Sequence, residues 1–327
     1  MNKRRQLLSL ATAALAWPGV ARAAPPDTLA SLPGLRILVP TLAGGTIDLL
    51  ARVLAQWFGQ SHKLQVTVLN LDGASGEIAL RRLITEPADG RTWLLAQESL
   101  ITINPSFYPR PSTDILDGIV PLALIATSSF YMLLRVDDNI SSFRDLLRES
   151  RSVSVPLPYG SGGVGTLHHL SMEGLAANLD LKLLHVPYKG NAQAVQALVR
   201  GEIRVLLAGT SALPLVDAGR LKMVAVSGPR RMAAYPDIPA LNEFVPGFQP
   251  TNWFGLFARK GVPDSVLGEM RELLRQSLDS DEVRNTVRDR GNVDTGFANG
   301  RAFTDLIMGD RQRYAEIAQR LALPKRP

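Results

Sequence analysis

The chain has 327 residues, of which 36 are Lys or Arg, 30 are Asp or Glu and none is Cys. The absence of cysteine excludes disulfides and metal–thiolate sites. Four basic residues and no acidic residue lie in the first 23 positions, so without this segment the formal charge falls from +6 to +2. So small a charge, dispersed among acidic residues, excludes the basic surface that nucleic-acid binding requires.

The N-terminal segment has the order of a secretory signal peptide. A basic start at 3–5 precedes an apolar run over 7–20 and a small-residue site at 21–23. The run is shorter than the roughly 20 residues that a membrane-spanning helix needs. We therefore predict cleavage after Ala23, export to the periplasm and no membrane insertion of the remaining chain. Arg4-Arg5 leaves twin-arginine export open, although the flanking residues favour the general secretory route.

Two segments of the remaining chain repeat one order of elements. In the first, strand patterns at 36–40, 64–69 and 92–96 alternate with helix patterns at 48–54 and 77–84. In the second, strand patterns at 153–155, 181–186 and 203–207 alternate with helix patterns at 167–177 and 192–199. Two such β-α-β-α-β units predict two α/β lobes, each a mainly parallel sheet with flanking helices. One larger doubly wound sheet is the alternative.

The C-terminal part is predicted to return to the first lobe. After a proline-rich loop, the patterns predict a strand at 252–257 and helices at 265–278, 281–290 and 301–321, which we expect to pack on that lobe. The chain would then cross between the lobes twice, and paired crossings form a hinge. We assign residues 24–128 and 252–327 to lobe 1 and residues 129–251 to lobe 2.

Each unit carries glycines between its first strand and its first helix, at Gly44-Gly45 and from Gly160 to Gly165. Glycines at a helix start leave backbone N–H groups free to bind an anion. A hydrogen bond to a charged group contributes about 1.5–3 kcal/mol, whereas micromolar binding needs about 8 kcal/mol. One loop is therefore insufficient, and we expect closure of the lobes to be coupled to ligand binding.

Seven stretches of the chain resemble one protein family. They are Val39-Pro40 with Gly44-Gly45 and Asp48, Ile103-Asn-Pro-Ser-Phe-Tyr108, Ser161–Thr166 with His169-Leu170, His185-Val-Pro-Tyr-Lys-Gly190, Ala218-Gly-Arg-Leu-Lys222, Pro236-Asp-Ile-Pro239 and Trp253-Phe-Gly-Leu-Phe-Ala258. In this order they resemble the Bug family, the substrate-binding proteins of tripartite tricarboxylate transporters. The resemblance implies a type II periplasmic binding protein with a Venus-flytrap hinge. It also implies a small organic carboxylate as ligand and integral-membrane transporter subunits as partners, and we expect a monomer.

The resemblance places the ligand at the two glycine loops. The predicted ligand-binding residues are Leu42, Ala43, Gly44, Gly45, Thr46, Asp48, Glu98, Ser129, Ser161, Gly162, Gly163, Gly165, Thr166, His169, Tyr188 and Gly209. Ala43, Ile47, Gly162 and Gln193 depart from the usual family pattern and remove side-chain contacts. If Glu98 faces the cleft, its carboxylate would repel a second carboxylate and favour an amine, and a solvated loop charge is the alternative role of this residue. We therefore hypothesise a ligand with one carboxylate and a cationic or donor group near Asp48 and Glu98.

Two other functions are alternatives. The run from Gly160 to Gly165 also fits the dinucleotide fingerprint G-x-G-x-x-G, which would indicate an exported dinucleotide-dependent enzyme. The acidic residue that would bind the ribose about twenty positions later is missing. Adjacent histidines, His168 and His169, point about 100° apart on a helix, unlike a pair of metal ligands. We predict no enzyme activity, no cofactor and no metal. A solute sensor with a signalling partner is the second alternative.

Overall fold

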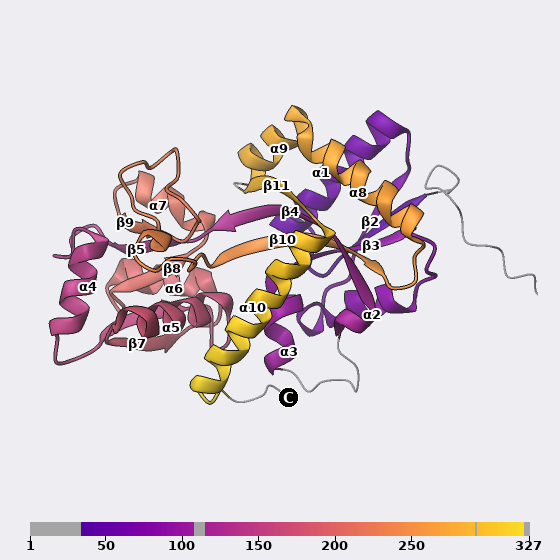
Figure 1. The fold of residues 1–327 in the computed structure, drawn as a ribbon. Helices are drawn as coiled ribbons and strands as arrows, with labels where there is room; N and C mark the ends of the chain where they lie inside the picture. Colours follow the sequence, from indigo (N-terminus) through magenta and orange to yellow (C-terminus); the bar gives the residue numbers. More distant parts are fainter. Residues whose placement is uncertain (1–33, 108–114, 292, 324–327) are drawn as a thin grey trace, which may run out of the picture.

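The chain forms two lobes that lie side by side, each around its own β-sheet (Figure 1). The computed structural model describes residues 34–107, 115–291 and 293–323, so the predicted signal peptide lies outside the described residues. Buried apolar clusters lie on both faces of each sheet, beneath the helices. The predicted two-lobed α/β fold is confirmed, and two separate sheets contradict the alternative of one larger sheet.

The two sheets have six and five strands. In spatial order, the sheet of lobe 1 holds β11 (Asp294–Asn299), β4 (Ile119–Ser129), β10 (Thr251–Arg259), β3 (Thr92–Gln97), β1 (Leu35–Val39) and β2 (Val66–Asn70). The sheet of lobe 2 holds β7 (Leu183–Pro187), β6 (Leu157–Ser161), β8 (Val205–Ala208), β5 (Tyr131–Arg135) and β9 (Leu221–Val226).

The helices follow the two sheets in chain order. They are α1 (Thr46–His62), α2 (Glu77–Thr85), α3 (Asn104–Phe107), α4 (Phe143–Ser152), α5 (Leu167–Leu179), α6 (Asn191–Arg200), α7 (Leu213–Asp217), α8 (Asp264–Asp279), α9 (Asp281–Gly291) and α10 (Gly300–Arg320). Short helical turns are η2 (Ala74–Gly76), η3 (Ser99–Ile103), η4 (Ile115–Asp117), η5 (Thr210–Ala212) and η6 (Leu241–Glu243). None of the described helices combines the length and the apolar character that crossing a bilayer requires.

The repeated units have the same topology. β1 lies between β2 and β3 and is parallel to both, and β6 lies in the same way between β7 and β8. The other strands pair antiparallel, so both sheets are mixed, in contrast to the expected mainly parallel sheets. The mixture arises because the chain leaves lobe 1 through β4 and returns through β10, which run in opposite directions.

The first strand of the second unit is β6, which begins at Leu157 and not at the predicted residue 153. Residues 153–156 lie outside any strand, directly after α4. Pro158 has no N–H to donate and therefore weakens the strand pattern in the sequence. The structure tolerates this proline because β8 pairs with β6 only at Tyr159 and Gly160.

Alternate side chains of β1 fill two cores. Ile37 and Val39 pack in one cluster with residues of α1 and α8, whereas Leu38 packs on the other face with Leu80 and Leu83 of α2. A central strand that is covered on both faces is largely apolar, and the exception in β1 is the half-buried Arg36, which pairs with Glu86 at 2.7 Å. Burial of each such side chain stabilises the fold by about 1.5–3 kcal/mol, so β1 holds the loop after it on a rigid base.

Two covalent crossings join the lobes. β4 runs into β5 through the single residue Phe130, and the chain returns where β10 begins at Thr251. At the first crossing, Phe130 N donates a 2.8 Å hydrogen bond to Ser227 Oγ, and Ser227 N donates a 2.9 Å bond to Phe130 O. The chain therefore passes from the sheet of lobe 1 to the sheet of lobe 2 at Phe130. Hydrogen bonds hold the backbone of Phe130 to Ser227, the residue after β9 of lobe 2.

Helix α10 makes a third connection between the lobes (Figure 1). Its first half buries Phe303 and Ile307 in a cluster of lobe 1, and its second half buries Tyr314 and Ile317 in a cluster of lobe 2. The sequence predicts packing on lobe 1 alone. Both halves are buried because apolar residues recur along one side of this 21-residue helix, which is long enough to pass from one lobe to the other.

Candidate ligand-binding site

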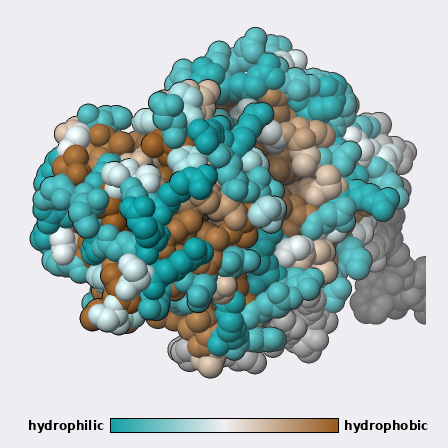
Figure 2. Space-filling view, turned by 60° about the vertical axis from the view of Figure 1, so that its left-hand side comes forward, coloured by the Kyte–Doolittle hydropathy of each residue, from teal (hydrophilic) through white to brown (hydrophobic). Residues whose placement is uncertain are grey.

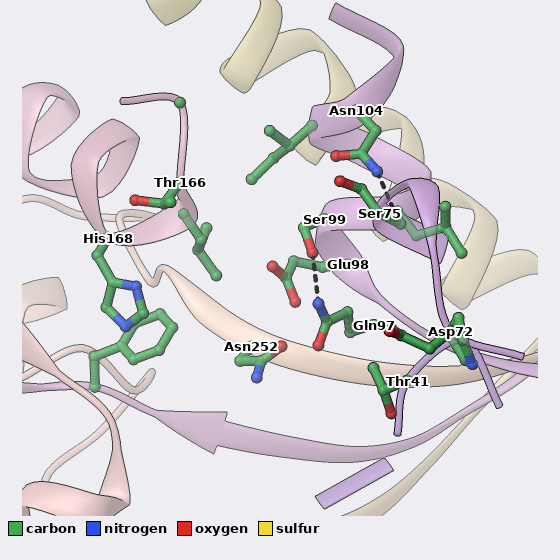
Figure 3. Close-up of a pocket in the computed structure, with 16 residues that line it drawn as sticks. Thr41, Asp72, Ser75, Gln97, Glu98, Ser99, Asn104, Thr166, His168 and Asn252 are labelled. Atoms are coloured by element: carbon green, nitrogen blue, oxygen red, sulfur yellow. Dashed lines mark hydrogen bonds between the residues drawn. The ribbon is translucent and has the colours of Figure 1, made fainter. Parts of the chain in front are cut away.

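A cavity of about 410 Å³ lies between the lobes (Figure 3). It is lined by Pro40, Thr41, Asp72, Ser75, Gln97, Glu98, Ser99, Leu100, Ile103, Asn104, Phe130, Gly165, Thr166, Leu167, His168 and Asn252. The volume is typical of sites for small organic molecules. The space-filling view shows apolar residues in the hollowed middle of one face, with hydrophilic residues around them (Figure 2). A molecule in the cavity would touch both lobes.

The lobe 2 wall is the loop between β6 and α5. Its glycines Gly163 and Gly165 have φ angles of 125° and 72°, which side-chain-bearing residues rarely adopt. Thr166 caps α5: its hydroxyl donates to Gly163 O at 2.8 Å and accepts from His169 N at 3.4 Å. The first N–H groups of a helix have no partner within the helix. The start of α5 therefore brings N–H donors and partial positive charge to the cavity.

Two histidines, the buried His169 and the half-buried His185, support this loop. His169 Nδ1 accepts a 3.1 Å hydrogen bond from Gly165 N, and its ring stacks on His185 with 3.9 Å between centroids. His185 Nε2 lies 2.7 Å from Ser161 Oγ, which also bonds to both backbone groups of Gly163. Burial lowers the pKa of each of these two histidines to about 4, so both rings are neutral near pH 7. The network holds the loop in shape.

The lobe 1 wall carries a buried carboxyl group, Glu98, directly after β3. Its side chain is 2% exposed, and its Oε2 atom has no hydrogen-bond partner among the described residues. Burial raises the pKa of Glu98 to about 8, and Asp310 of α10 acts in the same direction. Hydrogen bonds from backbone N–H groups and from the Ser99 hydroxyl act against this shift.

Two further polar atoms of the lining are buried and lack a partner within the described part of the chain: Asn252 Oδ1 on β10 and His168 Nε2 on α5. His168 lies against Phe130, with 4.6 Å between ring centroids, and burial lowers its pKa to about 4. Buried polar atoms without partners cost free energy. Three of them around one cavity indicate a ligand with polar groups of its own.

Residues 50–323 match the family model of TctC, the tripartite tricarboxylate transporter family receptor. The chain belongs to this family. The resemblance to the Bug receptors is thereby confirmed at the level of the family.

Solved structures and a relative agree with this assignment. A UPF0065 protein of Bordetella pertussis is 31% identical over 83% of this chain and 83% of its own length. The crystal structure of a TctC solute-binding protein from Polaromonas has 24% identity and a TM-score of 0.78, covering 88% of this chain and 98% of that chain. An R. palustris protein solved with adipate has 25% identity and a TM-score of 0.71, covering 88% and 96%. The TctC receptors are periplasmic binding proteins.

Asp48 of this TctC receptor was predicted to lie near a cationic group of the ligand, but its carboxylate binds other residues of the protein. The Asp48 carboxylate is buried and accepts hydrogen bonds from Gly44 N at 2.9 Å, Arg52 Nε at 2.9 Å and Asn70 Nδ2 at 3.0 Å. The Arg52 bond is the main cause that lowers the pKa of Asp48 to about 2. With its oxygens occupied and its side chain outside the cavity, Asp48 holds the first loop and does not meet a ligand there.

The first glycine loop of the receptor forms the rim of the cavity. Pro40 and Thr41 line the cavity, and the next residues lead away from it. Four of these residues are exposed, with Leu42 at 71%, and the fifth is half-buried. These rim residues are Leu42, Ala43, Gly44, Gly45 and Thr46.

Three of the predicted ligand-binding residues line this cavity: Glu98, Gly165 and Thr166. Seven other predicted residues are not part of its lining, namely Ser129, Ser161, Gly162, Gly163, His169, Tyr188 and Gly209. Tyr188 packs against an apolar cluster of lobe 2. Of the two adjacent histidines on α5, His168 lines the cavity and His169 faces the core, since adjacent helix residues point in different directions.

Sequence reasoning did not predict several lining residues, of which Asn252, Asp72 and Phe130 are chemically the most distinct. Asn252 is the first residue of the strand predicted at 252–257, and Asp72 follows the strand predicted at 64–69 by three residues. Their places next to strand ends are the signal that could have identified them. Among the described residues, no group of three or more His, Cys, Asp or Glu could hold a metal ion.

Proposed function

We propose that this chain is an exported periplasmic receptor that captures a small organic carboxylate between its lobes and delivers it to the membrane subunits of a tripartite transporter. The observation that carries the proposal is the cavity of about 410 Å³ bordered by the start of α5. The R. palustris relative solved with adipate, a dicarboxylate, supports the ligand class. The chain acts as a monomer and performs no chemistry on its ligand.

The start of α5 is suited to a carboxylate. The N–H groups of Leu167 and His168 belong to the first helical turn, where the helix dipole favours negative charge. Thr166 is fixed as the cap of this turn, so the donors are held in place before a ligand arrives. Such preorganisation lowers the entropy cost of binding.

Both lobes are required for useful affinity. A few charge-assisted hydrogen bonds from α5 fall short of the roughly 8 kcal/mol of micromolar binding. Lobe 1 adds polar groups from the end of β3 and from β10, and its rim loop over 42–46 lies next to the cavity entrance at Thr41. Closure of the lobes around the ligand completes the set of contacts, and the closed receptor is the form that docks on the transporter.

Thermal-shift screening against mono- and dicarboxylates, including adipate, tests the proposal. A ligand at 100 times its Kd stabilises the folded state by about 2.7 kcal/mol. Thr41→Trp places a large ring in the cavity from a half-buried position and is expected to abolish the shift. Thr67→Trp, on an exposed face of the edge strand β2, is the matched control and should retain it. Absence of any shift across the panel would contradict the proposal.

A further inference from the structure

We propose that the ligand of this cavity carries an ammonium group, which Glu98 and Asn252 bind on lobe 1, in addition to the carboxylate that α5 binds on lobe 2. This inference rests on the proposed function, because it concerns the same cavity. It identifies the substrate class as amino acids and related amine-bearing carboxylic acids.

The lobe 1 wall carries hydrogen-bond acceptors that have no donor in the described part of the chain. Glu98 Oε2 and Asn252 Oδ1 are both buried, and neither has a hydrogen-bond partner in the described part of the chain. Both residues line the cavity, and Figure 3 shows their oxygen atoms turned toward the same space. An ammonium group has three N–H donors and can satisfy both oxygens at once.

The described side chains that line the cavity include acidic residues but no lysine or arginine. Glu98 and Asp72 are the acidic residues of the lining, and there is no Lys or Arg among the sixteen described residues that line the cavity. Asp310 of α10 adds a further carboxyl group behind Glu98. A buried carboxyl group ionises readily only beside a counter-charge, and the protein offers none within the cavity, so Glu98 keeps its proton while the cavity is empty. A cationic ligand group supplies that counter-charge, so Glu98 releases its proton and pairs with the cation, whereas a bridging water would leave Glu98 protonated.

The two walls of the cavity favour ligand groups of opposite charge. Thr166 and His168 of lobe 2 lie on one side of the cavity, and Glu98 and Asn252 of lobe 1 lie across from them (Figure 3). The helix start favours a negative group and the lobe 1 wall favours a positive one. A zwitterionic ligand matches both walls in one orientation. A dicarboxylate would place its second carboxylate beside Glu98, where no cationic side chain of the lining balances its charge.

The proposal corrects the hypothesis drawn from the sequence. Asp48 is satisfied by Gly44, Arg52 and Asn70, so it has no free oxygen for a ligand cation. Asn252 takes its place as the second acceptor. The pair is formed by two neighbouring strands, because β3 ends before Glu98 and β10 pairs antiparallel with β3.

The test is calorimetric titration of the purified protein at pH 7.5 with matched probes. Each α- or ω-amino acid of two to six carbons is compared with the acid in which a methyl group or hydrogen replaces the ammonium, such as 5-aminopentanoate against pentanoate. Succinate and adipate represent dicarboxylates. The proposal expects the best amine-bearing acid to bind at least about tenfold more tightly than its partner without the amine.

Glu98→Gln is the matching variant, since it keeps the size of the side chain and removes its charge. It should weaken binding of the amine-bearing acid at least about tenfold and leave the amine-free partner within about twofold. The comparison of probes on the unmodified protein does not depend on the folding of this variant.

The outcomes separate the two proposals. If dicarboxylates or amine-free acids bind and amine-bearing acids bind no better, the ammonium site is wrong and the carboxylate receptor stands. If no probe of either kind binds, the proposed function is contradicted and the ammonium site with it. Tight binding of an amine-bearing acid that is unchanged in Glu98→Gln would place the amine elsewhere and overturn the inference.

Discussion

Glu98 and Asn252 meet on one wall of the interlobe cavity, although 154 positions of sequence separate them. The meeting is a consequence of strand pairing, because β10 lies antiparallel to β3 with Phe254 opposite Gln97. Glu98 follows Gln97 by one residue, and Asn252 precedes Phe254 by two, so both lie at the same end of the paired strands. Pairing of these strands therefore places two buried oxygen acceptors on the same wall of the cavity.

The pH dependence of stability tests the buried state of Glu98. Its pKa is about 8 in the folded protein against 4.5 for a solvent-exposed glutamate, so the folded state keeps a proton that the unfolded chain releases. The contribution of protonated Glu98 to the free energy of unfolding is complete below pH 4.5 and is lost as the pH rises through 8. The free energy of unfolding falls by about 1.4 kcal/mol per pH unit at most in this range. In urea unfolding of the ligand-free protein, Glu98→Gln should flatten this decline.

Two neighbouring groups define the control for that experiment. Asp310 and Tyr314 of α10 face Glu98, and burial raises the pKa of both, so part of the slope from Asp310 should remain in Glu98→Gln. Asp72→Asn alters an exposed carboxylate of the same cavity and should keep the wild-type slope. An identical slope in wild type and Glu98→Gln would show that Glu98 is ionised and solvated.

The histidines predict the opposite trend at acid pH. Burial lowers the pKa of His168, His169 and His185 to about 4, against 6.5 for a solvent-exposed histidine. Their contribution to stability is therefore complete above pH 6.5 and is lost as the pH falls toward 4. Each histidine should cost roughly 1–3 kcal/mol at pH 4. Unfolding measured from pH 7 to pH 4 in the Glu98→Gln background isolates this loss, and His168→Gln should reduce it.

Gly165→Ala tests the shape of the lobe 2 wall. Gly165 has φ of 72°, and an added Cβ would lie 3.1 Å from Phe107 Cε1. We expect a loss of about 1–2 kcal/mol in the free energy of unfolding and weaker binding of any carboxylate found in the screen. Gly268→Ala in α8 is the matched control: its Cβ meets nothing within 4 Å, and helix propensity predicts a gain of about 0.5–1 kcal/mol. Equal stability and binding in both variants would contradict this account of the loop.

Trp253→Phe tests the attachment of α10. The fully buried Trp253 donates a 2.9 Å hydrogen bond from Nε1 to Asp310 Oδ2. Phenylalanine keeps most of the apolar contact with Phe303 but leaves this carboxylate oxygen without its buried donor. We expect a loss of about 1.5–3 kcal/mol in chemical denaturation. Asp310→Asn, which keeps an acceptor for the indole and removes the charge, should lose less. Equal losses would assign the effect to charge and not to the hydrogen bond.

Much of the fold could be predicted because local patterns carry it. Helices such as α1 and α6 begin directly after a glycine, and their apolar residues recur at helical spacing. The residue at which the chain crosses from lobe 1 to lobe 2 was harder to predict from the sequence. From Ile119 to Leu134 the chain is a nearly continuous apolar run in which one residue, Phe130, separates β4 from β5. No turn residue marks that change of sheet.

The site could be predicted only in part, because side-chain partners are set by tertiary contacts. The glycine pattern identified Gly165 and Thr166, and the strand end identified Glu98. The occupation of Asp48 by Asn70 depends on the pairing of β1 with β2, which brings these residues together over 22 positions. The part played by Arg52 was visible in the sequence, since i,i+4 pairs on a helix face meet.

The most direct measurement is a crystal structure of the receptor with the tightest ligand from the thermal screen. The account predicts that a ligand carboxylate oxygen lies about 2.7–3.2 Å from the backbone N–H of Leu167 or His168, and that the ligand fills the cavity that Glu98 and Asn252 line. A ligand bound outside this cavity, with the start of α5 uncontacted, would contradict the central claim.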